Sequence, residues 1–194
     1  MSAIATTATA TTAAATLEST SGTGAPRPLR TQDRVVVFND LVDSTPLLVE
    51  LGDEAFADLL DVLDVERLRL VTLHGGRLVN LAGDGALMAF DTTDDAVAFA
   101  IDFNETCKLL GIRSRTGIHR GDVMVRSNGD LAGLAVNTAA RIESAAPAGG
   151  IVASASAVAT TSAPFEPMGP ARLKGIDGTT ELFSLVADDL ALAA

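Results

Sequence analysis

The chain has 194 residues, one cysteine and a formal net charge of −11, from 14 Lys and Arg against 25 Asp and Glu. This length suits one domain with its own core, and a lone cysteine cannot form an internal disulfide, which favours a reducing, cytoplasmic setting. The acidic charge argues against binding to nucleic acid polymers, which needs a basic surface, and no apolar run approaches the roughly 20 residues of a membrane span.

Residues 1–33 are dominated by Ala, Thr and Ser. This composition offers little to bury, so we predict a low-complexity, disordered tail. The segment holds two acidic and two basic residues, which cancel, so the net charge of −11 falls entirely in residues 34–194. We predict one folded domain over residues 34–186 and a short tail at 187–194.

Regular elements are predicted from residue 34 onwards. The β-branched run 34–39 (RVVVFN) is typical of a central buried strand, and Ser44-Thr45-Pro46 of a helix start. Apolar spacing predicts helices at about 54–73, 93–110 and 134–146, and strands at 78–81, 86–90, 115–118, 122–126, 151–153 and 181–186. The order β-α-β-β-α-β followed by a C-terminal extension predicts an α+β, ferredoxin-like core.

Two aspartates occupy positions from which their side chains can converge. Asp40 directly follows the first strand, and Asp84 lies in a Gly-Asp-Gly turn between two strands. The first strand and the central hairpin are neighbours in a ferredoxin-like sheet, so the carboxylates can meet and hold Mg²⁺ together with substrate phosphates. Taken singly, Asp84 also fits an ordinary hairpin turn and Asp40 a strand-end cap.

Four segments resemble, in the right order, the motifs of class III nucleotidyl cyclases, the family of adenylyl and guanylyl cyclases. Residues 37–45 (VFNDLVDST) resemble the first metal motif and residues 76–85 (GRLVNLAGDG) the second. Residues 133–141 (GLAVNTAAR) look like the transition-state helix, and residues 173–175 (LKG) resemble a loop that contacts the triphosphate. The resemblance covers about residues 34–186.

The resemblance implies a cyclisation reaction. The ribose 3′-hydroxyl of a nucleoside triphosphate attacks the α-phosphate, releasing pyrophosphate and a 3′,5′-cyclic monophosphate. Two Mg²⁺ or Mn²⁺ ions would be held by Asp40, Asp84 and the backbone carbonyl of Leu41. One ion would lower the pKa of the hydroxyl and both would neutralise phosphate oxygens, so no separate protein base is needed.

The resemblance also assigns roles to three other residues. Asn137 and Arg141 are four positions apart and share a helix face. Asn137 would orient the ribose, Arg141 would meet charge on the α-phosphate, and Lys174 would contact the β- and γ-phosphates. Considered alone, Arg141 also fits a surface side chain lying over an alanine-rich helix. In the family the aspartates and the Asn/Arg helix come from different domains, which implies a homodimer with two shared sites.

Base choice depends on two positions. Adenylyl cyclases of this family recognise adenine with a Lys three positions before the Gly-Asp pair and an Asp seven positions before the Asn. Those positions hold Asn80 and Asp130 here. Asp130 can accept from the adenine amine and Asn80 can donate to adenine N1, whereas guanine and uracil would present a carbonyl to Asp130, at a cost of about 1–3 kcal/mol. We expect ATP as substrate, CTP as a distant alternative, and GTP or UTP as poor substrates.

Two other functions fit parts of the pattern. Asn80 in place of Lys is compatible with a cyclase-like nucleotide-binding or dimerisation module that has little turnover, although the joint presence of metal and transition-state residues argues against it. A diguanylate cyclase or polymerase palm shares the predicted core, but Gly-Asp-Gly-Ala stands where the first of these carries Gly-Gly-Asp-Glu-Phe.

The remaining reactive side chains have simpler interpretations. A single histidine without a ligand partner, such as His119, is more often structural, and Cys107 falls on the apolar stripe of a predicted helix. Arg113, Arg115 and Arg120 form a basic cluster that fits either a solvated face or support of the site.

Overall fold

The computed structural model describes residues 30–186. Residues 1–29 of the predicted N-terminal tail and the whole of the predicted tail at 187–194 lie outside the described residues. Among residues 30–186, no helix is both long and apolar enough to cross a membrane. The elements in chain order are β1 (Arg30–Leu41), α1 (Ser44–Leu51), α2 (Asp53–Leu73), β2 (Arg77–Ala82), β3 (Gly85–Phe90), α3 (Thr93–Leu109), β4 (Ser114–Val125), β5 (Leu131–Ala132), α4 (Leu134–Ala145), β6 (Ile151–Ser154), α5 (Ala155–Val158), β7 (Phe165–Ala171) and β8 (Thr180–Leu185).

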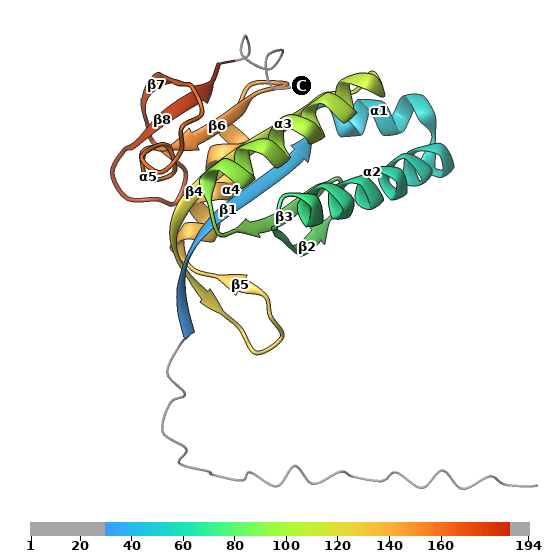
Figure 1. Cartoon of the computed structure of the whole chain (residues 1–194). Helices are drawn as coiled ribbons and strands as arrows, with labels where there is room; N and C mark the ends of the chain where they lie inside the picture. Colours follow the sequence, from blue (N-terminus) through green and yellow to red (C-terminus); the bar gives the residue numbers. More distant parts are fainter. Residues whose placement is uncertain (1–29, 187–194) are drawn as a thin grey trace, which may run out of the picture.

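One twisted sheet organises the molecule, with strand order β2-β3-β1-β4-β6-β8-β7 and with β5 beside β4. The first four strands in this order, together with α2 and α3, form the predicted ferredoxin-like core. β6, β8 and β7 continue the sheet as the predicted C-terminal extension. Figure 1 shows β1 running through the middle of the domain, with α1, α2 and α3 on one side of the sheet.

The valine run of β1 explains why the sheet is covered on both faces. Successive strand side chains point to opposite faces. Val35 and Val37 pack in a cluster with α2 and α3, whereas Val36 packs in a second cluster with α4. All three valines are fully buried, so a continuous apolar run replaces the alternating pattern of a half-exposed strand. β1 is therefore the central strand that the sequence predicts.

The structure corrects two predicted boundaries. β1 begins at Arg30 rather than Arg34, so residues 30–33 belong to the sheet and not to the predicted tail. The two strands predicted at 115–118 and 122–126 form one strand, β4, instead of a pair. Both errors have one cause: β1 pairs with β4 along its whole length, from Arg30↔Val125 to Leu41↔Ser114, and this long-range pairing holds the chain extended across Gly121. β5, β7 and α5 were not predicted.

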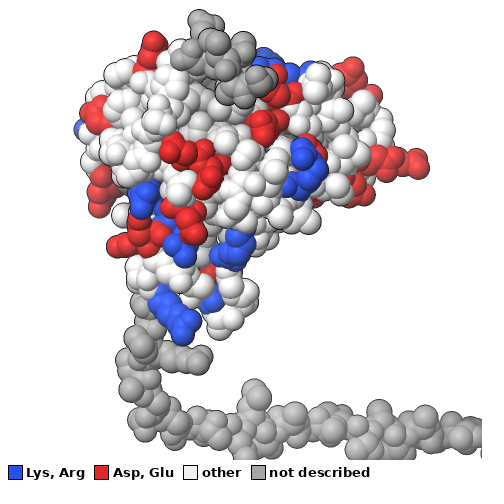
Figure 2. Space-filling model, in the orientation of Figure 1, with Lys and Arg blue, Asp and Glu red and all other residues white. Residues whose placement is uncertain are grey.

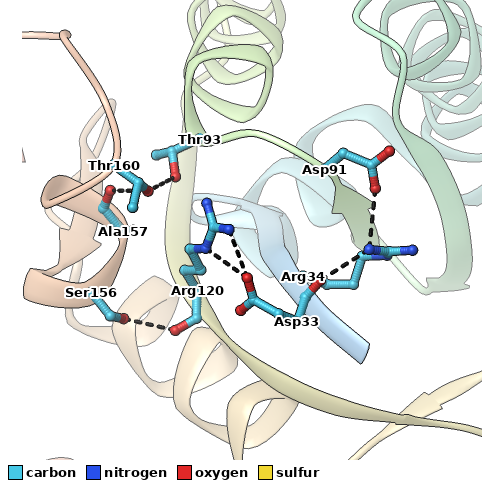
Figure 3. A network of polar contacts seen from close by, with 8 residues as sticks. All are labelled: Asp33, Arg34, Asp91, Thr93, Arg120, Ser156, Ala157 and Thr160. Carbon is cyan, nitrogen blue, oxygen red and sulfur yellow. Dashed lines mark hydrogen bonds and ion pairs between the residues drawn. The ribbon is translucent and has the colours of Figure 1, made fainter. Parts of the chain in front are cut away.

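Polar contacts anchor the early part of β1 (Figure 3). Asp33 accepts hydrogen bonds from Arg120 Nη2 at 2.6 Å and Nε at 2.9 Å. Arg34 forms an ion pair with Asp91 at 3.3 Å. The hydroxyl of Ser156 donates to the Arg120 backbone carbonyl at 2.7 Å, which ties α5 to β4, the strand that pairs with β1. Arg120 of the basic cluster thus supports the sheet.

We expect Gly117→Ala to destabilise the domain by about 1–3 kcal/mol or more, because it overfills a packed contact. α4 crosses β4 at Gly117, and a Cβ there would lie 2.6 Å from the Ala139 carbonyl oxygen and 2.6 Å from Glu143 Cα. Gly121→Ala on the same strand is the matched control, since its Cβ would approach atoms no closer than 3.2 Å. Urea unfolding measures both; equal losses would contradict the close-packing argument.

Candidate active site

The ladder between β1 and β3 brings Asp40 and Asp84 together. Its last pair is Asn39↔Ala86, so Asp40 and the Gly83-Asp84 turn lie just beyond the same end. A Cβ built on Gly85 would lie 3.3 Å from Asp40 Oδ1, which places this carboxylate against the hairpin that carries Asp84. Burial raises the pKa of Asp40, and the neighbouring Asp84 carboxylate raises it further, against a hydrogen bond from Arg115 that lowers it.

Arg115 connects Asp40 to α4. Arg115 is the cross-strand partner of Asp40 on β4, and its Nη2 donates to Asp40 Oδ2 at 3.0 Å. Its Nε lies 2.5 Å from Oε1 of Glu143, a buried α4 residue. Burial raises the pKa of Glu143. Burial alone would lower the pKa of the Arg115 guanidinium, but the carboxylates of Asp40 and Glu143 outweigh it, so that this pKa is raised. The sequence alone does not decide between a solvated and a supporting role for Arg115, and Glu143 is not among the predicted site residues.

α4 turns Asn137 and Arg141 outward. Thr138, Ala139 and Ile142 face the sheet and are buried, whereas Asn137 and Arg141 are exposed on the opposite side of the helix. The two therefore share one face, as their spacing predicts. Because they point away from the core, their side chains are free to meet another surface.

A cavity of about 280 Å³ lies between the end of β1 and α4. Its lining includes Asp40, Asn80, Arg141 and Glu143. Small-molecule sites that enclose a whole ligand usually measure about 300–1,000 Å³. The cavity of one protomer therefore lies at the lower limit of this range.

The other predicted site residues lie outside this cavity. Asp130 is in the loop between β4 and β5, where it pairs with Arg126 at 3.3 Å and accepts a hydrogen bond from the Leu131 backbone N–H at 2.8 Å. Lys174 is exposed in the loop between β7 and β8. Leu41, whose carbonyl is predicted to help hold a metal, ends β1 with its side chain buried. A single chain thus does not bring all predicted site residues into one pocket.

The Asp40 and Asp84 pair fits a divalent cation. Burial raises the pKa of Asp40 most and the adjacent Asp84 carboxylate raises it further, and a bound cation would remove the repulsion between the two carboxylates. Residues 30–186 hold no group of three or more His, Cys, Asp or Glu side chains arranged for a metal. Mg²⁺ commonly takes only one or two protein carboxylates and completes its coordination with water and phosphate oxygens, so a pair is enough.

Other side chains have structural roles. His119 Nδ1 lies 2.8 Å from the Ser154 hydroxyl, and burial lowers the pKa of the imidazole. Cys107 is buried in the core, and burial raises the pKa of its thiol. Neither contacts Asp40 or Asp84, in agreement with the structural interpretation. Arg113 pairs with Asp43 at 3.0 Å where α1 begins.

One buried residue was missed. Arg67 on α2 has no exposed surface and contacts both segments that carry the aspartates. The signal was present, because position 67 is four residues after Leu63 and three before Leu70 on the apolar stripe of α2. An arginine at such a position has to be paired internally.

Comparison with known proteins identifies the family of the chain. Residues 28–187 match the family model described as the adenylate and guanylate cyclase catalytic domain. This chain belongs to that family. An uncharacterized protein of Mycobacterium tuberculosis is 32% identical over 151 residues, which make up 76% of this chain and 40% of the relative. The chain thus spans less than half the length of that relative.

Solved cyclase structures share the fold. The adenylyl cyclase CyaB of P. aeruginosa superposes with a TM-score of 0.74 and 26% identity, over 81% of this chain and 96% of that chain. The guanylate cyclase domain of RhGC from Catenaria anguillulae, in complex with GTP, gives a TM-score of 0.73 and 27% identity, over 81% and 98%. The α+β cyclase fold predicted from the sequence is confirmed, and the neighbours include both base specificities.

We expect Asp84→Asn to raise the thermal unfolding midpoint by a few degrees in metal-free buffer at pH 7, because it removes one of two adjacent charges. The pKa of Asp40 is raised in the folded protein, so the destabilisation develops as pH rises through that pKa. The gain should therefore shrink as the pH falls towards about 4. Calorimetry with EDTA at several pH values measures it. Asp58→Asn, at an exposed position of α2, is the control; an equal gain there would contradict the prediction.

Proposed function

We propose that this cyclase domain converts ATP to 3′,5′-cyclic AMP and pyrophosphate in a homodimer with two shared active sites. Asp40, Asp84 and the Leu41 carbonyl of one protomer would hold two Mg²⁺ or Mn²⁺ ions. Asn137 and Arg141 come from α4 of the other. The relatives include an adenylate cyclase of Streptomyces coelicolor, 36% identical over 114 residues, which are 58% of this chain and 30% of that protein.

The observation that carries the proposal is that one chain holds an incomplete site. Asp40 and Asp84 converge at one end of the sheet and Arg141 lines the same cavity as Asp40, but Asn137, on the exposed face of α4, is not among the residues that line it. Two such incomplete surfaces, related by a two-fold axis, build two equivalent complete sites. This arrangement also explains why one chain leaves its transition-state residues exposed.

The chain's residues divide the work of an in-line displacement. The new bond joins the ribose 3′-oxygen to the α-phosphorus, the hydroxyl proton passes to solvent, the bond from that phosphorus to the bridging oxygen breaks, and pyrophosphate leaves with the electron pair. A divalent cation bound at the aspartates supplies the positive charge that acidifies the hydroxyl and stabilises the phosphate oxygens. Asn137 orients the ribose, and Arg141 donates to the α-phosphate oxygens with a guanidinium that stays charged. Lys174 neutralises the terminal phosphates.

Asp130 supports adenine over guanine. Its carboxylate only accepts hydrogen bonds, so it complements the adenine amine and opposes the guanine carbonyl. In the free chain this carboxylate is engaged by Arg126 at 3.3 Å, at an exposed position where such an ion pair is weak. Adenine binding would replace that contact at low cost. Asn80 lines the cavity next to Asp40 and offers an amide donor in place of lysine.

The nucleotide preference is testable directly. Purified protein with Mn²⁺ should cyclise ATP best, CTP weakly and GTP or UTP least, as separated by chromatography of the products. Asp130→Asn should narrow the ratio of ATP to GTP turnover by about tenfold, because an amide can donate to the guanine carbonyl. Asp122→Asn, on strand β4, is the control. Equal turnover of GTP and ATP by the wild type would reject the ordering, and nucleotide binding without product would favour a non-catalytic module.

Mixing of inactive variants tests the shared site. Asp40→Ala and Arg141→Ala should each be inactive, yet an equal mixture should recover about a quarter of wild-type activity. Half of the dimers are then mixed, and each mixed dimer has one intact site out of two. Asp40→Ala mixed with Asp84→Ala is the control and should stay inactive, since both changes damage the metal side. Absence of recovery in the first mixture would rule out sites shared between chains.

A further inference from the structure

The guanidinium of Arg67 is enclosed on the α2 side of the sheet, against the segments that carry the two aspartates. Arg67 lies on α2 and is fully buried. Its charge is balanced by Asp64, whose Oδ1 accepts from Nη1 at 2.7 Å, and one face stacks on Phe103 with 4.9 Å to the ring centre. Removing a guanidinium from water costs several kcal/mol unless its donors are used.

Those remaining donors go to the two segments that carry the aspartates. Nε donates to Asn39 Oδ1 at 3.2 Å, and Nη2 donates to the backbone carbonyl of Asp84. Asn39 is the residue before Asp40 on β1, and its side chain points to the α2 side of the sheet because Asp40 points to the α4 side. Arg67 thus bonds the β1 segment and the β2–β3 turn from below.

These bonds begin where the sheet ladder stops. The last β1–β3 pair is Asn39↔Ala86, and the β2–β3 ladder closes at Ala82↔Gly85. Beyond these pairs no backbone ladder fixes Asp40 relative to Asp84. The side chain of Asn39 is held in turn by Thr116, whose Oγ1 lies 3.3 Å from Nδ2. The hydrogen bonds of the planar Arg67 guanidinium therefore connect the two segments where ladder bonds are missing.

Filling the core at position 67 would not require an arginine. An apolar side chain at position 67 would fill the stripe between Leu63 and Leu70 without any desolvation cost. It would leave Asn39 Oδ1 and the Asp84 carbonyl without this donor. The placement of a costly buried cation on these two acceptors indicates that their relative position matters.

We propose that Arg67 is a positioning residue for the metal site, which fixes the separation of Asp40 and Asp84 by bonding Asn39 and the Asp84 carbonyl. The inference rests on the proposed function, because it presumes that these aspartates bind divalent cations. Arg67 touches neither metal nor nucleotide. Its removal should weaken metal binding much more than nucleotide binding, since partners that orient metal ligands typically contribute 10–100-fold in affinity.

The test uses the whole chain and Mn²⁺ alone as the probe, with free Mn²⁺ counted by electron paramagnetic resonance. Arg67→Met, which keeps the length of the side chain but removes every donor, should raise the Kd for Mn²⁺ at least about tenfold. Arg67→Lys keeps the charge and one hydrogen-bonding nitrogen, so its Kd for Mn²⁺ should lie between those of the wild type and Arg67→Met. In turnover assays the Mn²⁺ requirement should rise in the same order, while the KM for ATP at saturating Mn²⁺ changes by less than about threefold.

Controls separate positioning from loss of fold. Arg69→Met removes an exposed arginine of the same helix that pairs with Glu66, and it should bind Mn²⁺ as the wild type does. The double variant Arg67→Met/Asp64→Asn also removes the partly buried carboxylate that Arg67→Met leaves unpaired, and its thermal unfolding midpoint tests whether it remains folded. If this variant unfolds, Arg67→Lys decides the question.

The outcomes separate the two proposals. If wild-type protein binds no more Mn²⁺ than Asp84→Asn and makes no cyclic product, the proposed function fails. If wild type binds Mn²⁺ and turns over while folded Arg67 variants bind it equally well, the positioning role alone is overturned. A parallel rise in Kd for Mn²⁺ and in KM for ATP would likewise indicate general damage and overturn it.

Discussion

The antiparallel pairing of β1 with β3 on one side and β4 on the other is the constraint on which the rest of the structure depends. The pairing with β3 ends at Asn39 and the pairing with β4 ends at Leu41. The pairing therefore fixes what the side chains at this end of β1 can reach. Alternation sends Asn39 towards α2 and Asp40 towards α4. The same strand therefore bonds to a structural arginine below the sheet and presents a carboxylate above it.

Acidic charge at the site is balanced by a few well-placed guanidinium groups. The chain carries a net charge of −11, yet Asp40 is hydrogen-bonded by Arg115, and Arg67 lies below the turn of Asp84. Figure 2 shows Lys and Arg gathered towards the end of the molecule that carries the β4–β5 hairpin, with acidic residues spread over the rest. Because the chain carries a net negative charge, handling a triphosphate requires local positive charge rather than a basic field.

α4 belongs to two environments. Its inner face packs on β4 at Gly117, where no side chain would fit, and Glu143 reaches Arg115 from there. Its outer face carries Asn137 and Arg141. Since Arg115 also bonds Asp40, α4 and the first aspartate are linked within one chain. In the proposed dimer, however, Asp40 serves one active site, and Asn137 and Arg141 of the same chain serve the other.

The sequence by itself determined the core architecture and the candidate chemistry. The Val35–Val37 run, the Gly-Asp-Gly turn, and the spacing of Asn137 and Arg141 are local patterns that depend on neighbours within a few residues. Tertiary structure decided the continuity of β4, the start of β1 at Arg30, and the partners of Arg67 and Arg115. Those depend on pairings between distant positions, such as Arg115 with Asp40 across 75 residues, and no local pattern encodes which strand lies beside another.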